Sequence, residues 1–239
     1  MDILTLKLEL YNTESSLELI NQLVSENDKC IIVSDPPYNV KYHYKDYHDN
    51  KPLAQYIKET SDILIRDDIP CVVLAYPEIV YQFSIYKQKT PTKICTWVYN
   101  ANTAHQHRNI AYYNIKPDFN LVRQPYKNPN DARIKKLIAE GSKGAKLYDW
   151  WEFQQVKNVS AEKTAHPCQI PEKVMRNVCG IVPGTGWTVI DPFCGAGSTA
   201  IGCLKANQDR EEDAFIKFIG IDITQEYLDI TTDRIKNYE

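Results

Sequence analysis

Short runs of apolar residues alternate along the chain with longer segments in which apolar residues recur every three or four positions. The short runs predict buried strands because of their length and their β-branched residues. They lie at 30–33, 71–76, 186–191 and 216–222. The periodic segments predict amphipathic helices, which lie at 13–28, 171–182, 197–207 and 224–237. This alternation predicts a layered α/β fold with a largely parallel sheet.

Two further strands are predicted in the middle of the chain, at 93–100 and 108–116, where apolar residues flank a polar turn. A helix is predicted to start near Pro52, which suits a first helical turn, and to run to about Arg66. Asn50 is the expected cap of that helix because its side chain can accept a backbone hydrogen bond.

Residues 117–151 are irregular and rich in Pro, Asn, Gly and Lys, with one short helical candidate at 132–140. A long irregular segment inside a compact domain is usually functional or disordered. The same region is basic: residues 116–146 hold eight Lys or Arg and three acids, whereas the whole chain has a net charge of -3. A local basic surface suits phosphate binding, and a merely solvated loop is the equally weighted alternative.

Composition narrows the class of protein. The chain has 239 residues, of which 43% are hydrophobic and 25% charged, and it has no apolar run long enough for a membrane span. The start of the chain lacks the features of a secretory signal, so an intracellular protein is expected. Seven scattered cysteines form no CxxC pair, and the five histidines show no metal-ligand spacing. Core thiols in a reducing compartment are therefore expected, and no metal site.

An acid, two prolines and an aromatic residue follow the first buried strand, as Asp35, Pro36, Pro37 and Tyr38. The prolines end the strand and leave the acid and the ring at its carboxyl end. Open α/β sheets bind their ligands at that edge.

A glycine turn follows the strand that ends at Asp191. Gly195 and Gly197 let a ligand lie against the backbone just before a helix that Ser198 or Thr199 could cap. Asp222 ends the next strand, where an acid commonly accepts hydrogen bonds from ribose hydroxyls. The turn and the acid together suggest an adenosine-containing cofactor, although Asp222 could instead cap the following helix.

Three motifs resemble those of the S-adenosylmethionine-dependent amino-methyltransferases. Residues 35–38 (DPPY) resemble the catalytic motif, residues 166–171 (HPCQIP) the tenth motif and residues 191–199 (DPFCGAGST) the first motif. The catalytic motif comes before the cofactor motif, as in the circularly permuted β-class DNA methyltransferases. The resemblance covers nearly the whole chain. It implies a single methyltransferase domain over 1–239 with a Rossmann-like fold, a mixed seven-stranded sheet and helices on both faces.

The resemblance also implies S-adenosylmethionine as cofactor and a set of site residues. Asp35, Pro36, Pro37 and Tyr38 are the expected catalytic residues. The expected cofactor-binding residues are Asp35, His166, Cys168, Gln169, Asp191, Pro192, Phe193, Cys194, Gly195, Gly197, Ser198, Asp222 and Ile223. Residues 117–151 match the family's target-recognition region in placement. The expected DNA-binding residues are Asn39, Arg123, Tyr126, Lys127, Lys135 and Lys136.

The chemistry of the DPPY motif can be given without the family name. A nucleobase amine is a poor nucleophile because its lone pair is delocalised into the ring. Asp35 and the carbonyl of Pro36 can accept hydrogen bonds from the two amine protons and direct the lone pair toward a methyl sulfonium. Tyr38 can stack on an extruded base, and such stacking contributes about 1–3 kcal/mol. That is comparable with the cost of unstacking a base, and the transfer needs no metal.

Two features depart from the family pattern. The tenth motif usually reads HPTQKP, so Cys168 and Ile170 replace a hydroxyl and a cation near the cofactor. The letters PCQ at 167–169 also resemble the nucleophile motif of cytosine carbon-5 methyltransferases, but they precede the cofactor motif here. Packing is the favoured role of Cys194.

The favoured function is site-specific methylation of the adenine amino nitrogen in double-stranded DNA. Three alternatives stay open: cytosine N4 methylation of DNA, adenine methylation of RNA, and a non-catalytic subunit that binds nucleic acid. A short recognition region suggests that few base pairs are read, with a second copy or a partner subunit assisting.

Overall fold

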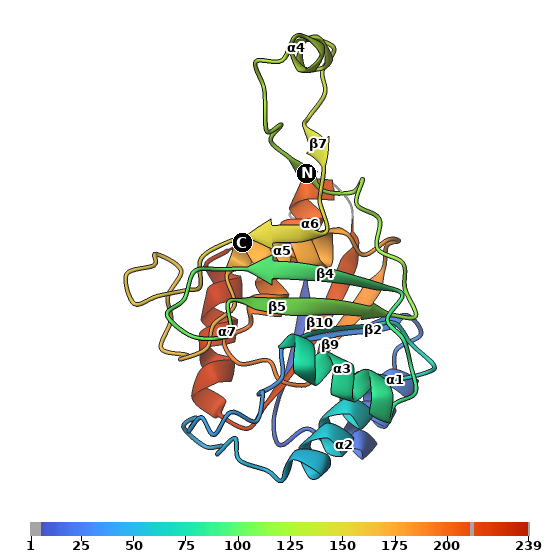
Figure 1. Cartoon of the computed structure of the whole chain (residues 1–239). Coiled ribbons are helices and arrows are strands. Elements are labelled where there is room, and N and C mark those ends of the chain that lie inside the picture. The colour runs from blue at the N-terminus through green and yellow to red at the C-terminus, as the bar shows by residue number, and fades with distance from the viewer. Residues whose placement is uncertain (1–5, 211–212, 239) are drawn as a thin grey trace.

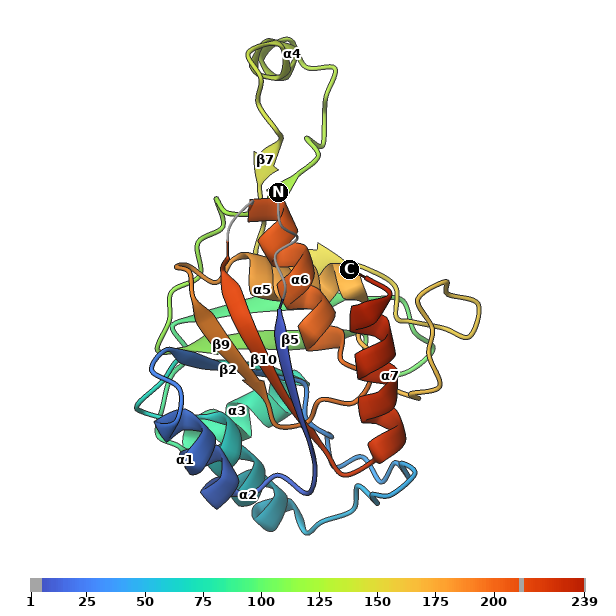
Figure 2. The same cartoon turned by 180° about the vertical axis from the view of Figure 1, so that it is seen from behind.

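The computed structural model describes residues 6–210 and 213–238, and a central sheet with helices on both faces forms the body of the molecule (Figures 1 and 2). The sheet is mixed, as expected, and has eight strands in the described residues, one more than the seven expected. Along the sheet, the strands are β1 (Lys7–Asn12), β10 (Phe215–Asp222), β9 (Trp187–Asp191), β2 (Cys30–Ser34), β3 (Cys71–Ala75), β5 (His107–Tyr113), β4 (Lys93–Val98) and β8 (Trp150–Glu152). The edge strand β8 has three residues, too few to show an alternating pattern.

Strand direction decides which side chains meet. Neighbouring strands from β1 to β3 run parallel, and their carboxyl ends form one edge of the sheet. Only β5 runs against its neighbours among the described strands of this sheet, pairing antiparallel with β3 and β4. The amino end of β5 therefore lies at the same edge as the carboxyl ends of the other strands.

The helices divide between the two faces of the sheet (Figures 1 and 2). One face is covered by α1 (Leu17–Ser25), α2 (Leu53–Leu64) and α3 (Pro77–Tyr86). The other is covered by α5 (Glu172–Gly180), α6 (Ser198–Arg210) and α7 (Gln225–Lys236). Each face has its own apolar core, because alternate side chains of the buried strands point to opposite faces.

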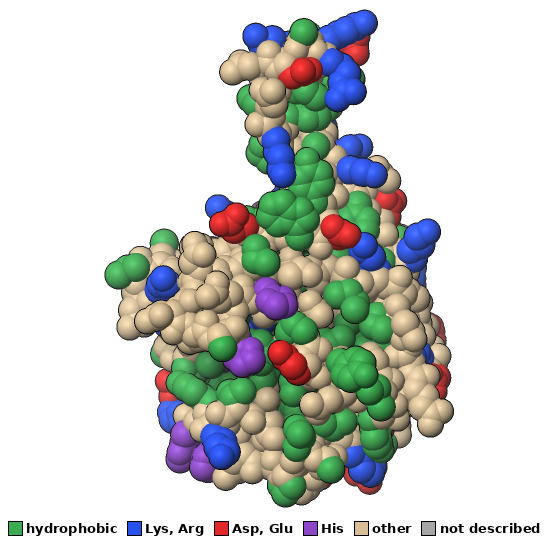
Figure 3. Space-filling model, viewed as in Figure 1, with side chains coloured by type: hydrophobic (Ala, Val, Ile, Leu, Met, Phe, Trp, Pro, Cys, Tyr) green, Lys and Arg blue, Asp and Glu red, His purple; other side chains and the backbone are tan. Residues whose placement is uncertain are grey.

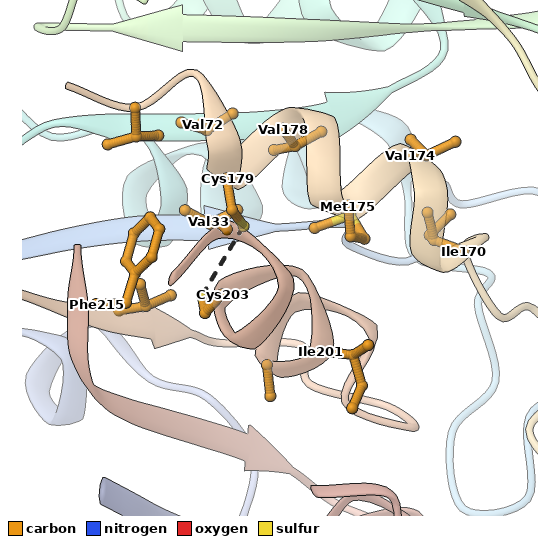
Figure 4. Close-up of a cluster of buried hydrophobic side chains, with 14 of the residues drawn as sticks. Val33, Val72, Ile170, Val174, Met175, Val178, Cys179, Ile201, Cys203 and Phe215 are labelled. Carbon is orange, nitrogen blue, oxygen red and sulfur yellow. Dashed lines mark hydrogen bonds between the residues drawn. The ribbon is translucent and has the colours of Figure 1, made fainter. Parts of the chain in front are cut away.

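The core beneath α5 and α6 is tightly packed (Figure 4). A Cβ at Gly202 of α6 would lie 2.8 Å from the carbonyl oxygen of Met175 in α5, so only glycine lets the two helices approach this closely. The Sγ atoms of Cys179 and Cys203 face each other there at 3.8 Å. All seven cysteines are free thiols, and six are buried.

Helix boundaries follow local chemistry with two differences from expectation. The Ser16 hydroxyl accepts a hydrogen bond from the amide of Leu19 and caps α1. Asn50 does not cap α2: Pro52 holds that position without a side-chain bond. Helix α3 was not predicted from its pattern, and its first residue is Pro77, whose fixed φ suits a first helical turn.

An arm of residues 123–146 projects away from the body (Figure 1). Its base is a short antiparallel pair of β6 (Arg123–Gln124) and β7 (Ala145–Lys146). Its tip is α4 (Ala132–Ala139), which is capped by Asp131 and has no buried residue. The arm lies within the expected target-recognition region 117–151, and the short helix predicted there is present.

Candidate active site

A cavity of about 820 Å³ lies at the carboxyl edge of the sheet. Strands β2 and β9 are neighbours, so residues far apart in the sequence come together there. The predicted residues that line the cavity are Asp35, Pro36, Pro37, Tyr38, His166, Cys168, Gln169, Asp191, Pro192, Phe193, Cys194, Gly195, Ser198, Asp222 and Ile223. The DPPY segment and the glycine turn thus share one space, as their positions after neighbouring strands predict.

Asp35 lies in the wall of this cavity with little contact to water. The Tyr38 hydroxyl donates a hydrogen bond to its Oδ1, and Oδ2 lies 3.7 Å from Nη1 of Arg108. Burial raises the pKa of Asp35 to about 7, and the Asp191 carboxylate adds to the rise while Arg108 opposes it. The carboxyl that is expected to accept the amine protons therefore changes its charge near neutral pH.

Sequence reasoning missed Arg108 because it begins a strand. The antiparallel direction of β5 places it at the cavity edge, where it is only 8% exposed. Its guanidinium carbon lies 4.8 Å from the ring centre of Tyr38 and 5.6 Å from that of Tyr76. A cation over an aromatic face is attracted by the electron density of the ring.

Asp191 ties the two central strands to the start of α6. Its carboxylate accepts hydrogen bonds from the hydroxyls of Ser34 and Thr199, both at 2.6 Å, and from the amide of Phe193. Burial raises its pKa to about 6, while the hydroxyl hydrogen bonds oppose the rise. Asp191 lines the cavity, and these bonds show that it also holds the frame of the site.

The glycine turn is fixed by Asp222. The Gly195 amide donates a hydrogen bond of 2.8 Å to Oδ2 of Asp222, whose Oδ1 accepts from the amide of Thr224. Gly195 has a φ of 50°, and a Cβ there would lie 2.9 Å from Nε2 of His166. The turn thus brings bare backbone to the cavity.

Gly197 differs from Gly195 because it does not line the cavity. It has a φ of 71°, and a Cβ would lie 2.6 Å from Cγ2 and 2.7 Å from Oγ1 of Thr231 in α7. The structure therefore gives Gly197 a packing reason, and its expected contact with the cofactor remains a prediction. Cys194 is buried nearby, with its Sγ 3.6 Å from Oγ1 of the same threonine.

The segment that resembles the tenth motif covers the glycine turn. The ring of His166 packs edge-on against that of Tyr227, with 4.4 Å between the ring centres. Burial lowers the pKa of His166 to about 4, so this imidazole is neutral at physiological pH. Gln169 is buried and accepts from the amide and hydroxyl of Thr164. Burial raises the pKa of the Cys168 thiol, which disfavours the thiolate that a nucleophilic role requires.

The loop after Tyr38 forms a second wall that the motifs did not reveal. Val40, Tyr42, Tyr44 and Tyr47 line the cavity. Asp49 is fully buried and its carboxylate accepts from the amides of residues 39 and 40, which fixes the fold of the loop. The high tyrosine content of this loop was the sequence feature that could have indicated a role in the site.

The expected DNA-binding residues lie outside the cavity. Asn39 has a φ of 58° and its side-chain amide donates to the carbonyl of Lys51, so it helps to hold the same loop. The others lie on the arm: Arg123, Lys127, Lys135 and Lys136 are exposed and Tyr126 is partly exposed. Figure 3 shows Lys and Arg side chains distributed over the arm.

Lys127 links the arm to the body. Its Nζ lies 5.1 Å from the ring centre of Tyr148 and 5.0 Å from that of Trp150. These two rings are stacked on each other, and Trp150 is 45% exposed. A cation and exposed rings of this kind can contact phosphates and bases.

The described residues contain no group of three or more His, Cys, Asp or Glu side chains arranged to hold a metal ion. Within the same residues, no helix combines the length and the apolar character that crossing a bilayer requires.

Comparison with known proteins identifies the family. A family model described as DNA methylase (N6_N4_Mtase) matches residues 30–233. The type II methyltransferase M.BglII of Bacillus subtilis is 24% identical over 93% of this chain and 67% of its own length. M.HpaI of Haemophilus parainfluenzae, also a type II methyltransferase, is 25% identical over 89% of this chain and 69% of its own.

Two solved structures share the fold. The cytosine-N4-specific PvuII DNA methyltransferase has a TM-score of 0.62 at 14% identity, covering 98% of this chain and 91% of its own. The M1.HpyAVI complex with SAM has a TM-score of 0.55 at 18% identity, covering 95% of this chain and 99% of its own. The family match spans most of the sequence and includes all three motifs, which confirms the resemblance. This chain belongs to the N6/N4 DNA methylase family.

Proposed function

We propose that this DNA methyltransferase transfers the methyl group of S-adenosylmethionine to the N6 amino group of an adenine in duplex DNA. Family membership supplies the general reaction and the methyl donor. The observation that carries the proposal is the shared cavity, in which the Asp35 carboxyl and the bare backbone at Gly195 face one space. An amine held at the first site can meet a methyl donor held at the second.

The residues present fit an adenosine-containing methyl donor. The turn at Gly195 has no room for a side chain and exposes backbone, and Asp222 keeps lone pairs beyond the two used by backbone amides. Ile223 follows at the cavity wall, where an apolar side chain can cover a base. In this proposal these residues hold the donor, whose sulfonium supplies an electrophilic methyl group.

The DPPY segment would hold the acceptor amine. Asp35 and the carbonyl of Pro36 accept hydrogen bonds from its two N–H groups, which weakens the conjugation of the lone pair with the ring and directs it at the methyl group. The N–C bond forms as the S–C bond of the donor breaks, the thioether leaves with the sulfonium electron pair, and the methylated nitrogen then loses one proton. The target base stacks against the part of Tyr38 that lines the cavity, where stacking offsets the few kcal/mol that unstacking costs. The prolines fix this segment, and positioning of this kind lowers the entropic part of the barrier.

The arm would contact the DNA outside the cavity. Its exposed Lys135 and Lys136 suit phosphates, and Arg123 at its base can read a guanine edge. Lys127 with Tyr148 and Trp150 forms a basic and aromatic surface between the arm and the body. The proposed division of labour is recognition by the arm and chemistry in the cavity.

The test is methyl transfer from tritiated S-adenosylmethionine to duplex DNA, single-stranded DNA and RNA, followed by digestion and nucleoside chromatography. The proposal expects label in N6-methyldeoxyadenosine from duplex DNA. Label in N4-methyldeoxycytidine would show that cytosine in DNA is the acceptor, and label in RNA adenosine would show that RNA is. Either result would contradict the proposed acceptor. Asp35→Ala protein is the matched control, and transfer that persists in it would refute the assigned site.

A further inference from the structure

Arg108 has an unusual environment for a charged side chain. Its guanidinium carbon lies near the ring centres of four aromatic residues: Tyr38 at 4.8 Å, Trp97 at 5.3 Å, Tyr76 at 5.6 Å and Tyr99 at 6.0 Å. Trp97 and Tyr99 are themselves buried. Burial of a cation is strongly unfavourable unless other groups compensate for the lost water.

Asp35 compensates most for the buried charge of Arg108, and Tyr99 and Tyr76 also favour its charged form. Asp35 is the carboxylate that forms an ion pair with Arg108, at 3.7 Å between Nη1 and Oδ2. This distance exceeds that of a direct hydrogen bond, and the Nε of Arg108 is buried with no hydrogen-bond partner among the described residues. One buried donor of the guanidinium is thus left unsatisfied, which is destabilising, so stability alone does not explain this arrangement.

Arg108 also contacts Tyr38, the second residue that is proposed to hold the base. The guanidinium lies over the face of Tyr38, and the hydroxyl of that tyrosine donates to Oδ1 of Asp35. Arg108 therefore contacts both residues that are proposed to hold the base. The hydroxyl uses one acceptor site on Oδ1, and the carboxylate keeps other lone pairs for an incoming amine.

We propose that Arg108 is a positioning residue for methyl transfer: its guanidinium favours the ionised form of the Asp35 carboxyl, so that the carboxylate can accept a hydrogen bond from the target amine, and it holds the Tyr38 ring in place. This inference rests on the proposed function. It adds the reason why an acid in a water-poor wall can act as a hydrogen-bond acceptor for the amine.

The charge of Asp35 is set by groups on several elements. Arg108 on β5 favours the carboxylate, while burial and Asp191 on β9 favour the neutral acid. The other titratable groups that face it are Tyr38, Tyr44, Tyr56, Tyr99 and Cys168. Removal of the guanidinium leaves no cation near the carboxyl among these groups. The acid would then stay protonated at neutral pH and present an O–H to the amine.

The test compares Arg108→Gln and Arg108→Lys with Arg66→Gln, which removes an arginine that pairs with Asp68 in a surface loop. Single-turnover transfer is measured from about pH 5.5 to 9.5, where a required carboxylate gives a rate that rises with pH. Arg108→Gln is expected to lower the rate at pH 7 about fivefold and to move the rising part of the pH–rate curve up by about one pH unit. Arg108→Lys keeps the positive charge, so the rising part of its pH–rate curve should lie at the same pH as in the wild type.

A second measurement does not depend on activity. Protein labelled with 13C at aspartate carboxyls is titrated by NMR, and Asp35→Asn identifies the Asp35 signal. Arg108→Gln should raise the titration midpoint of that signal by about one unit, while cofactor affinity in calorimetry stays unchanged. If Arg108→Gln does not fold, Arg108→Met fills the same aromatic surroundings with an uncharged chain and is judged by the same criteria.

Two results would overturn the inference. One is a uniform fall in rate at all pH values with no shift in the rising part of the pH–rate curve, which indicates a packing role alone. The other is an unchanged Asp35 titration in the uncharged variants. Failure of the proposed function gives a different outcome, because the wild-type protein would then methylate another acceptor or none, whereas the NMR titration involves no nucleic acid.

Discussion

The cavity and the arm are built in opposite ways. Around the cavity, side chains hold each other: Asp191 joins β2, β9 and α6, and Asp222 fixes the glycine turn. On the arm, α4 has no buried residue, and the base consists of a two-residue strand pair. The first region depends on the core of the body, whereas the second depends on its own backbone and its cap.

Because of this difference, we expect substitutions near the cavity and substitutions on the arm to have different effects. A change near the cavity alters chemistry and stability together, because the same residues line the site and pack the core. A change on the arm leaves the core untouched and alters only what the arm contacts. Under the proposed division of labour, recognition by the arm can therefore vary without cost to the fold. The following substitutions test whether the separation holds.

The largest effect is expected from Asp35→Ala. Loss of the carboxyl removes the acceptor for the amine, so methyl transfer should fall below detection while cofactor affinity in calorimetry stays within about twofold. Asp28→Ala, at an exposed acid in the turn before β2, is the control and should keep full activity. Substantial turnover by Asp35→Ala protein would remove this residue from the mechanism.

A pair of glycines compares the two regions directly. Gly197 and Gly141 both have a positive φ, but a Cβ at Gly197 would meet Thr231 while one at Gly141 meets nothing within 4 Å. Gly197→Ala should lower the free energy of unfolding by about 3 kcal/mol and weaken cofactor binding. Gly141→Ala should lower the free energy of unfolding by about 1 kcal/mol and leave cofactor binding unchanged. Urea denaturation measures both. Equal losses would show that backbone strain alone acts at the two positions.

A moderate effect is expected from Lys135→Gln combined with Lys136→Gln on α4. Each lysine that contacts a phosphate contributes about one unit to the slope of log K against log salt, so the double variant should lose about two. DNA affinity should fall several-fold, with an unchanged midpoint of thermal unfolding because neither side chain is buried. Fluorescence anisotropy at several salt concentrations provides the measurement. An unaltered slope would mean that the arm does not contact the DNA backbone.

The smallest effect is expected from Asp35→Asn on stability. The pKa of Asp35 is about 7 in the folded protein, above its ordinary value, so its contribution to stability is complete below pH 3.8 and is lost as the pH rises through 7. The asparagine variant should melt several degrees higher than wild type at pH 8 and match it near pH 4. Calorimetry at both values checks this. A difference of the opposite sign would mean that Arg108 stabilises the carboxylate more than burial destabilises it.

Sequence patterns predicted the parts of the site that follow strands. Asp35 and Gly195 come directly after buried runs, and the carboxyl ends of parallel strands meet at one edge, so their meeting could be inferred. The position of Arg108 at this edge could not be inferred. It lies at the start of a strand, and the antiparallel direction of that strand depends on pairing with β3 and β4. Its aromatic neighbours also come from three separate segments, and their convergence is a property of tertiary packing alone.

Local patterns also left some features of the structure unpredicted. Gly197 has the spacing of a ligand-binding glycine, but its contact with Thr231 comes from a helix that packs back over the turn. Asn50 is a good cap by type, yet the helix begins later, at Leu53. At Gly197 the close packing comes from a helix far along the chain, and a short window of sequence does not contain that information.

The paired thiols of Cys179 and Cys203 provide a built-in reporter. They face each other between α5 and α6, where reagents cannot reach them unless the helices separate (Figure 4). The rate at which a thiol-specific dye labels them therefore measures how often this part of the molecule opens. The native side chains serve as the probe, so no label needs to be introduced.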